Sequence, residues 1–192
     1  MSYEYLAASL PMFFFGDPPP MTTEELRARC AEQMTPRDLA VLDRLLEGRA
    51  EAGASGFEGA WAARERQIRA AAAAMRAPRY GADPRAERRP HPGWDGTVEK
   101  GVADAFSKPT PLEREMALDR ERWRVLDELA PAGVFTAATV WAYALKLRIA
   151  ERWAALREED GRKRFDEQLI AVVSSGPEPP TADSPSHFSQ VS

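Results

Sequence analysis

The chain has 192 residues, a net charge of −4 and 44% hydrophobic residues. This length suits one domain with appendages, the apolar content predicts a folded core, and the acidic balance gives no global attraction to nucleic acid. The single cysteine excludes an internal disulfide, and no apolar run reaches the ~20 residues of a membrane span. The first residues include Glu4 and no basic region, which is not typical of a signal peptide. We therefore expect a cytoplasmic protein without nucleic-acid binding or membrane insertion.

The N-terminal segment predicts a short element followed by an apolar run. Residues 2–10 place apolar side chains at helical spacing, although a short extended segment fits almost as well. The next run, at residues 12–15, is too apolar for free exposure to solvent. It predicts either a plug packed against the core or a docking patch, in which Phe13, Phe14 and Phe15 would contact another subunit.

Two helix starts follow in close succession. Thr22 and Glu25 have the spacing of a capping box, and Thr35 is followed by Pro36 at the first helical position. The second helix is expected to end near Gly48. Two short helices joined by almost no loop must turn sharply against each other.

The middle of the chain predicts a long helix and then a proline-rich loop. The helix spans Phe57 to Arg76, and the loop spans residues 77–94. The basic residues of this helix and loop form either a solvated surface or a contact for an acidic protein partner. Arg64 and Arg69, both in the helix, are the binding candidates. Apart from Tyr80, no aromatic side chains suited to base stacking are interleaved with the arginines, which disfavours nucleic acid. The arginines of this basic region are Arg64, Arg66, Arg69, Arg76, Arg79, Arg85, Arg88 and Arg89.

The second half predicts three further helices and a tail. After a short helix at residues 98–106, Thr110 and Glu113 repeat the capping signature before a helix that runs to Leu129. The next helix spans Thr136 to Gly161, where the glycine is expected to end it. A last helix is expected at 162–173, which makes 1–173 one helical domain, and the Pro- and Ser-rich tail at 174–192 is expected to be disordered.

Helical spacing predicts the apolar face of each long helix. We expect Trp123 to share a core with Trp141 or Trp153, because their helices are joined by a tight link. The expected faces are Phe57, Trp61, Ile68, Ala72 and Met75; Leu112, Met116, Trp123 and Leu126; and Trp141, Leu145, Ile149, Trp153 and Leu156.

No catalytic or metal-binding constellation is predicted. The two histidines, His91 and His187, lie in the proline-rich loop and in the tail, and Cys30 has no metal-ligating neighbours at suitable spacing. We therefore expect no enzyme, cofactor or metal, although carboxylates paired over a long range would be an alternative. Arg152 is expected either to pair with a carboxylate of the preceding helix, such as Asp119 or Glu115, or to make a subunit contact. Lys146 and Arg148 in the same helix are further candidates for a subunit contact.

Motifs in both halves of the chain resemble a bacterial family of unknown function, whose members are typically encoded among the subunits of V-type (A/V-type) ATPases. The residues that carry the resemblance are Tyr3-Glu-Tyr5-Leu-Ala-Ala-Ser9-Leu10-Pro11, Phe15-Gly16-Asp17-Pro-Pro, Pro111-Leu112-Glu113, Asp119, Arg122-Trp123, Tyr143, Lys146-Leu147, Glu151-Arg152-Trp153 and Gly161.

This resemblance implies an all-α protein, a single-domain antiparallel or orthogonal helical bundle similar to a shortened form of the central-stalk cap of V-type ATPases. That cap is the funnel-shaped helical subunit that joins the rotor stalk to the membrane ring. The resemblance also implies a non-catalytic subunit or an accessory or assembly factor that contacts stalk or ring subunits, in the cytoplasm or at the inner membrane surface through the ATPase complex. The alternative is a helical adaptor, unrelated to an ATPase, that binds an acidic partner through the basic region from Arg64 to Arg89.

Overall fold

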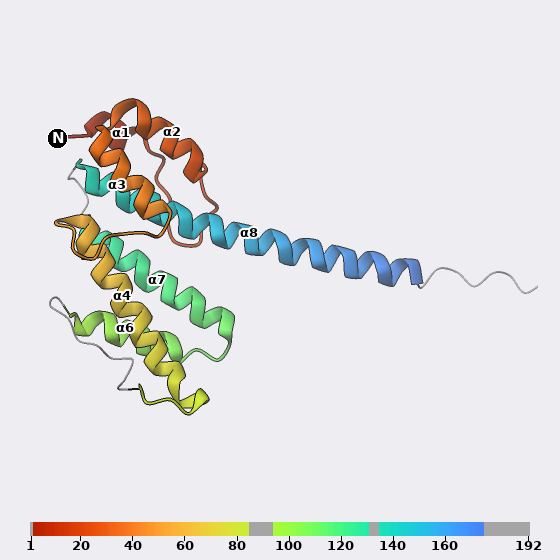
Figure 1. Ribbon diagram of the computed structural model, residues 1–192. Helices are drawn as coiled ribbons and strands as arrows, with labels where there is room; N and C mark the ends of the chain where they lie inside the picture. The colour runs from red at the N-terminus through yellow and green to blue at the C-terminus, as the bar shows by residue number, and fades with distance from the viewer. Residues whose placement is uncertain (1, 85–93, 131–134, 175–192) are drawn as a thin grey trace, which may run out of the picture. The chain divides into compact units, whose positions relative to one another are not determined.

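A computed structural model describes residues 2–84, 94–130 and 135–174, with side chains described as far as residue 157. Within these ranges the fold is all-α, as expected, and the only β pairing is an isolated bridge between Ser2 and Thr136. The elements, shown in Figure 1, are α1 (Glu4–Ser9), α2 (Thr23–Gln33), α3 (Pro36–Leu46), α4 (Phe57–Arg76), the 3₁₀ helix η1 (Ala77–Tyr80), α6 (Gly96–Phe106), α7 (Pro111–Leu129) and α8 (Ala137–Ser174).

The chain divides into two compact units, residues 1–154 and 155–192. Every packing interaction and site described below lies in the first unit. Of the expected loop at 77–94, the first four residues form the 3₁₀ helix, and residues 85–93 lie outside the described ranges. The expected tail lies outside them too, apart from its first residue.

The predicted N-terminal caps of α2, α3 and α7 are present. Thr22 accepts a hydrogen bond from the backbone N–H of Glu25 at 3.1 Å, and the Glu25 carboxylate accepts one from the Thr22 N–H at 2.8 Å. The same reciprocal pair joins Thr110 and Glu113, and Thr35 caps α3. Each cap satisfies backbone donors that the first turn of a helix leaves without partners. The predicted bounds of α7, and those of α4, which has no side-chain cap, are also confirmed.

The predicted end of the long helix at Gly161 is wrong, because α8 continues through this residue to Ser174. Glycine in a helix interior costs about 1 kcal/mol relative to alanine, which is a preference and not a barrier. The next residues, from Arg162 to Val173, have good helix propensity and include no proline. The separate last helix expected over this range is thus the end of α8.

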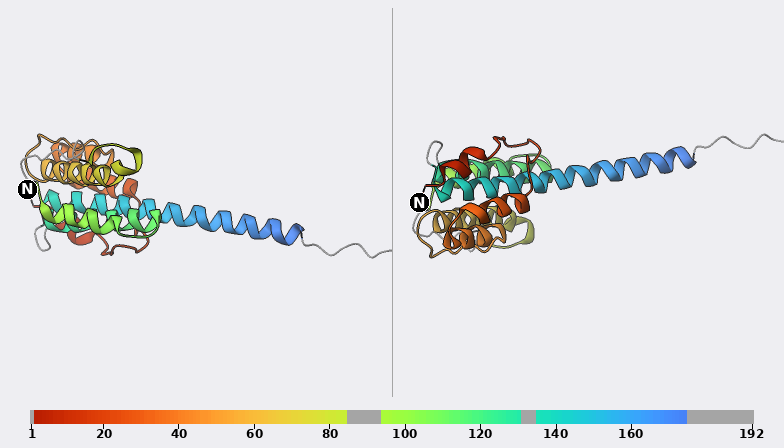
Figure 2. Two further views of the ribbon diagram at one scale, coloured as in Figure 1. Left: turned by 90° about the horizontal axis from the view of Figure 1, so that it is seen from below. Right: turned by 90° about the horizontal axis from the view of Figure 1, so that it is seen from above.

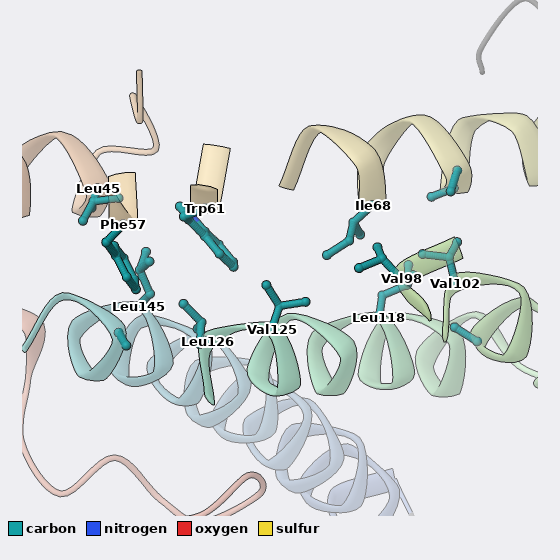
Figure 3. Packing of buried hydrophobic residues seen from close by; sticks show 14 residues of the cluster. Leu45, Phe57, Trp61, Ile68, Val98, Val102, Leu118, Val125, Leu126 and Leu145 are labelled. Carbon is teal, nitrogen blue, oxygen red and sulfur yellow. The ribbon is translucent and has the colours of Figure 1, made fainter. Parts of the chain in front are cut away.

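The first unit has two hydrophobic clusters that share the beginning of α8. In one cluster α4, α6 and α7 pack against one another and against α8 (Figures 1 and 2), and Figure 3 shows their buried side chains meeting between the helices. The second cluster joins α1, α2 and α3 to Val140, Ala144 and Leu147 of α8. Because Trp141 contacts both clusters, this part of α8 is buried on two faces and organises the unit.

Several expected core positions are wrong. Met75, Leu112 and Met116 are exposed, as is Leu156 of α8. Helical spacing identifies a stripe but does not identify the neighbour against which it packs. The side of α7 that faces α4 and α6 buries Leu118, Val125 and Leu126, whereas Leu112, Met116 and Trp123 lie on the other side.

Candidate functional site: an arginine-lined pocket

A pocket of about 440 Å³ opens between α4, α7, α8 and the segment that follows α3. Its apolar wall is made by Leu45, Trp61, Leu145 and Ile149. Figure 3 shows Trp61 pointing from α4 toward α7 and α8, in the same layer as Leu126 and Leu145. Packing against these helices buries all but 7% of Trp61, so this wall belongs to the core of the unit.

The charged wall of the pocket begins with a buried carboxylate. Asp119 is 1% exposed and accepts hydrogen bonds from Nη1 of Arg122 at 2.9 Å and from Nε1 of Trp153 at 2.7 Å. Arg152 of α8 also donates to it. A buried carboxylate is stable only when its lone pairs are satisfied, and Asp119 has three donors.

A second carboxylate, Glu65 of α4, extends this network. Arg122 donates to both of its oxygens, at 2.9 and 3.3 Å, and Nε of Arg69 donates to one of them at 2.7 Å. Arg122 therefore bridges Glu65 and Asp119, and this connects α4 to α7 through fixed charge-assisted hydrogen bonds.

Two further arginines of the pocket have no carboxylate partner among the described residues. Arg66 is exposed at the rim, and Arg148 directs Nη1 to the backbone carbonyls of Leu45 and Leu46, at 3.1 and 2.7 Å. The Arg148 contact caps the C-terminal end of α3, where helix carbonyls lack partners. The pocket thus contains five arginines and two acids, an excess of three positive charges in an acidic chain.

A buried ion pair holds the segment that forms one side of the pocket. Glu58, 4% exposed, accepts two hydrogen bonds from Arg44, at 2.8 and 2.7 Å, and one from the backbone N–H of Glu51 at 3.2 Å. The hydrogen bonds from Arg44 lower the pKa of the Glu58 carboxyl. The residues on either side of Glu51, Ala50 and Ala52, line the pocket, so this pair fixes the position of its rim.

Some of the expected binding residues line the pocket, and others lie elsewhere on the protein. Arg69, Arg148 and Arg152 line the pocket, and the pairing of Arg152 with Asp119 is the intramolecular alternative that the sequence predicted. Arg64 forms an ion pair with Asp95 at 3.1 Å and is not a lining residue.

Lys146 lies at a different surface, where an aromatic cluster includes Trp123. It pairs with Asp127, and its Nζ atom lies 5.2 Å from the centre of the Trp123 ring. Trp123 packs edge-on with Phe13 and Phe15, at centroid distances of 5.3 and 5.6 Å. Trp123 is not among the residues of either hydrophobic cluster, whereas Trp141 packs against both, and the expected core of Trp123 with Trp153 stays a prediction.

The apolar run at residues 12–15 divides between covered and exposed side chains. Phe13 and Phe15 pack as a plug, and the ring of Phe13 also lies 5.1 Å from that of Tyr143. Phe14 is 65% exposed and Met12 is 83% exposed. Of the three phenylalanines proposed for docking, Phe14 is therefore the one whose ring is mostly exposed. Docking through this residue stays a prediction.

Sequence reasoning missed the contributions of Trp61, Glu65 and Arg122 to the pocket. Asp119 and Arg122 are three residues apart, a helical spacing that could have indicated their ion pair. The long-range pairing of Arg122 with Glu65 leaves no comparable local signal. His91, His187 and the basic residues Arg85, Arg88 and Arg89 lie outside the described ranges.

Metal sites and membrane spans are both lacking in the part of the chain that the structure describes. No group of three or more His, Cys, Asp or Glu side chains among these residues could hold a metal ion. None of the helices in the same ranges is long and apolar enough to cross a membrane.

The first unit is thus an all-α bundle with an arginine-lined pocket. The sequence pattern of a family described as a protein of unknown function (DUF2764) matches residues 100–176, less than half of the chain. The matched part includes α7 and α8, and so Asp119, Arg122, Arg148 and Arg152 of the pocket, but not α4. Comparisons with curated proteins and with solved structures found no match.

Proposed function

We propose that this chain is a non-catalytic subunit, or an accessory or assembly factor, of a bacterial V-type ion-translocating ATPase, and that it acts through protein–protein contacts. The main support is that the motifs of the resemblance meet in space. The Tyr143 hydroxyl donates a hydrogen bond to the Pro11 carbonyl at 2.9 Å, and Phe15 packs on Trp123. Motifs more than 100 residues apart thus form one packed unit, as expected if they jointly define a fold.

The finer proposal is a bundle built like a shortened form of the central-stalk cap of V-type ATPases. It follows from the same resemblance and agrees with the all-α class of the described residues. Such a body would bridge other subunits through its surface. Because resemblance at the level of fold does not by itself assign a function, the contacts have to be tested directly.

The contact that we propose is centred on Phe14. Its ring is 65% exposed, beside the aromatic plug that Phe13 and Phe15 form on Trp123. Exposed aromatic rings on a rigid support often contribute much of the binding energy at protein interfaces. Met12, 83% exposed, would extend the same apolar contact.

Affinity purification of the tagged full-length chain from its own cells tests this function. At about 0.3 M salt, where exposed charges are strongly screened, we expect V-type ATPase stalk or ring subunits to co-purify. Phe14→Ser should reduce their recovery at least about tenfold, since the change removes an aromatic anchor. Tyr80→Ser alters another exposed aromatic residue and is the matched control. Purification of the wild-type chain without any ATPase subunit would refute the proposal.

The alternative function is a helical adaptor that binds an acidic protein through the basic region from Arg64 to Arg89. The observation that favours it is the exposure of Arg66 and Arg79, which have no carboxylate partner among the described residues. Arg76, by contrast, already pairs with Glu115 at 3.0 Å. An adaptor of this kind should lose its partner at about 0.3 M salt, whereas an apolar contact through Phe14 should persist.

A further inference from the structure

We propose that the arginine-lined pocket is a binding site for a small multivalent phosphate, either a free polyphosphate anion or the phosphate group of an organic ester. The proposal goes beyond the function above and does not depend on it. Its basis is the composition of the pocket, in which five arginines outnumber two carboxylates by three charges.

The carboxylates of the pocket cannot neutralise this excess. Asp119 already accepts from Arg122, Arg152 and Trp153, and Glu65 accepts from Arg122 and Arg69. Each acid thus accepts three hydrogen bonds, and these bonds also hold the guanidinium groups in place. The lining of the pocket therefore keeps a net positive charge that its own carboxylates do not balance.

Three arginines keep hydrogen-bond donors for such an anion. Arg66 is exposed and has no partner among the described residues, so none of its N–H groups is already used by them. Toward the other described residues, Arg148 uses Nη1, on the carbonyls of Leu45 and Leu46, and Arg152 uses Nη2, on Asp119. Guanidinium groups present paired N–H donors that match the oxygens of phosphate, and they keep their charge at every physiological pH.

The size and the walls of the pocket favour a small molecule. A volume of about 440 Å³ lies within the range of small-ligand sites. A phosphate bears about two charges and a polyphosphate more, so one small ligand can balance the excess. An acidic protein segment would supply a single charge with each side chain. Trp61 and Ile149 offer an apolar surface on which the organic part of an ester could rest.

Calorimetric titration of the full-length chain tests the site, with pyrophosphate as the first probe and ionic strength kept constant with sodium chloride. We expect one pyrophosphate per chain. Arg66→Gln should weaken binding about tenfold, because it removes charged hydrogen bonds to the anion and breaks none to the described residues. Arg79→Gln removes the same charge from another exposed position and should leave the affinity unchanged.

Two further probes identify the ligand. Tighter binding of pyrophosphate than of phenyl phosphate would support a free polyphosphate, and the reverse order would support an ester that uses the apolar wall. A tricarboxylate, citrate, tests the choice of phosphate chemistry. The proposal is overturned if about 10 mM pyrophosphate gives no binding heat, if both arginine variants lose affinity equally, or if citrate binds and pyrophosphate does not.

Discussion

The buried carboxylate of Asp119 supports one quantitative prediction about stability. Asp119→Ala replaces a group that accepts hydrogen bonds from Arg122, Arg152 and Trp153 with a methyl group. The indole N–H of Trp153, a residue only 9% exposed, would lose its partner. We expect the free energy of unfolding to fall by about 3 kcal/mol.

The magnitude follows from the exposure of each partner. Removing one member of a buried ion pair typically costs about 3–5 kcal/mol, because the remaining charge is buried without a counterion. Here the Arg152 side chain is 50% exposed and can be hydrated, and Arg122 keeps its bonds to Glu65. Both facts lower the electrostatic part of the loss. An unsatisfied Trp153 N–H adds about 1–3 kcal/mol, which leads to the value of about 3 kcal/mol.

Urea unfolding, followed by tryptophan fluorescence and by circular dichroism, measures this loss. Asp119→Asn keeps an oxygen acceptor for the Trp153 indole and should cost about half as much. Asp127→Ala is the matched control, because it also removes an ion pair, with Lys146, but its carboxylate is 60% exposed. This control should cost less than about 1 kcal/mol. If Asp119→Ala is no more destabilising than Asp127→Ala, the network has no structural role and the reasoning fails.

Three other predictions concern capping, pH and thiol reactivity. Thr110→Ala should lower the free energy of unfolding in urea by about 1 kcal/mol, because it removes the capping box of α7; an unchanged midpoint would contradict this. The lowered pKa of Glu58 means that its contribution is complete above the ordinary value of 4.5 and is lost as pH falls through the lowered pKa. Stability measured between pH 6 and about pH 3 should therefore fall more steeply in the wild-type chain than in Glu58→Gln, and parallel curves would exclude this role. Burial raises the pKa of Cys30 to about 11, so a thiol reagent at pH 8 should label it only after urea unfolding, and rapid labelling of the folded chain would show that it is not buried.

Local sequence signals predicted the secondary structure where capping chemistry decides it. Thr22, Thr35 and Thr110 each cap a helix as expected, because an N-cap side chain and the following backbone N–H groups are neighbours in sequence. Gly161 shows the limit of such signals. A glycine permits a left-handed end but does not impose it, and α8 continues through it.

The choice of buried face required information that helical periodicity does not contain. On α7, two stripes of large side chains compete: one includes Leu126 with Leu118 and Val125, and the other includes Leu112 and Trp123. The first is buried because α4 and α6 cover it. The second meets the aromatic plug only in part, through Trp123. Hydrophobic spacing alone could not distinguish these outcomes, since both stripes are apolar.

The sequence identifies some of the arginines that line the pocket as binding candidates, but it does not predict that they meet in one cavity. Arg69, Arg148 and Arg152 are candidates because of their charge, and they come from two helices that lie far apart in sequence. Only the packing of α4 and α8 around Trp61 brings them to one cavity. The sequence does predict the pairing of Arg152 with Asp119 as one alternative, because the helices that carry these two residues are expected to be neighbours.

The acids of this network and the proposed ligand have complementary roles. Asp119 and Glu65 fix Arg122, Arg152 and Arg69 before any anion arrives, so part of the ordering that binding would require is already complete. A ligand between these arginines would touch α4, α7 and α8 together and would oppose their separation. Because a ligand that binds only the folded state raises its stability by mass action, pyrophosphate should increase the unfolding midpoint of the wild-type chain more than that of Arg66→Gln. An equal increase in both would show that the anion acts on the protein without occupying this pocket.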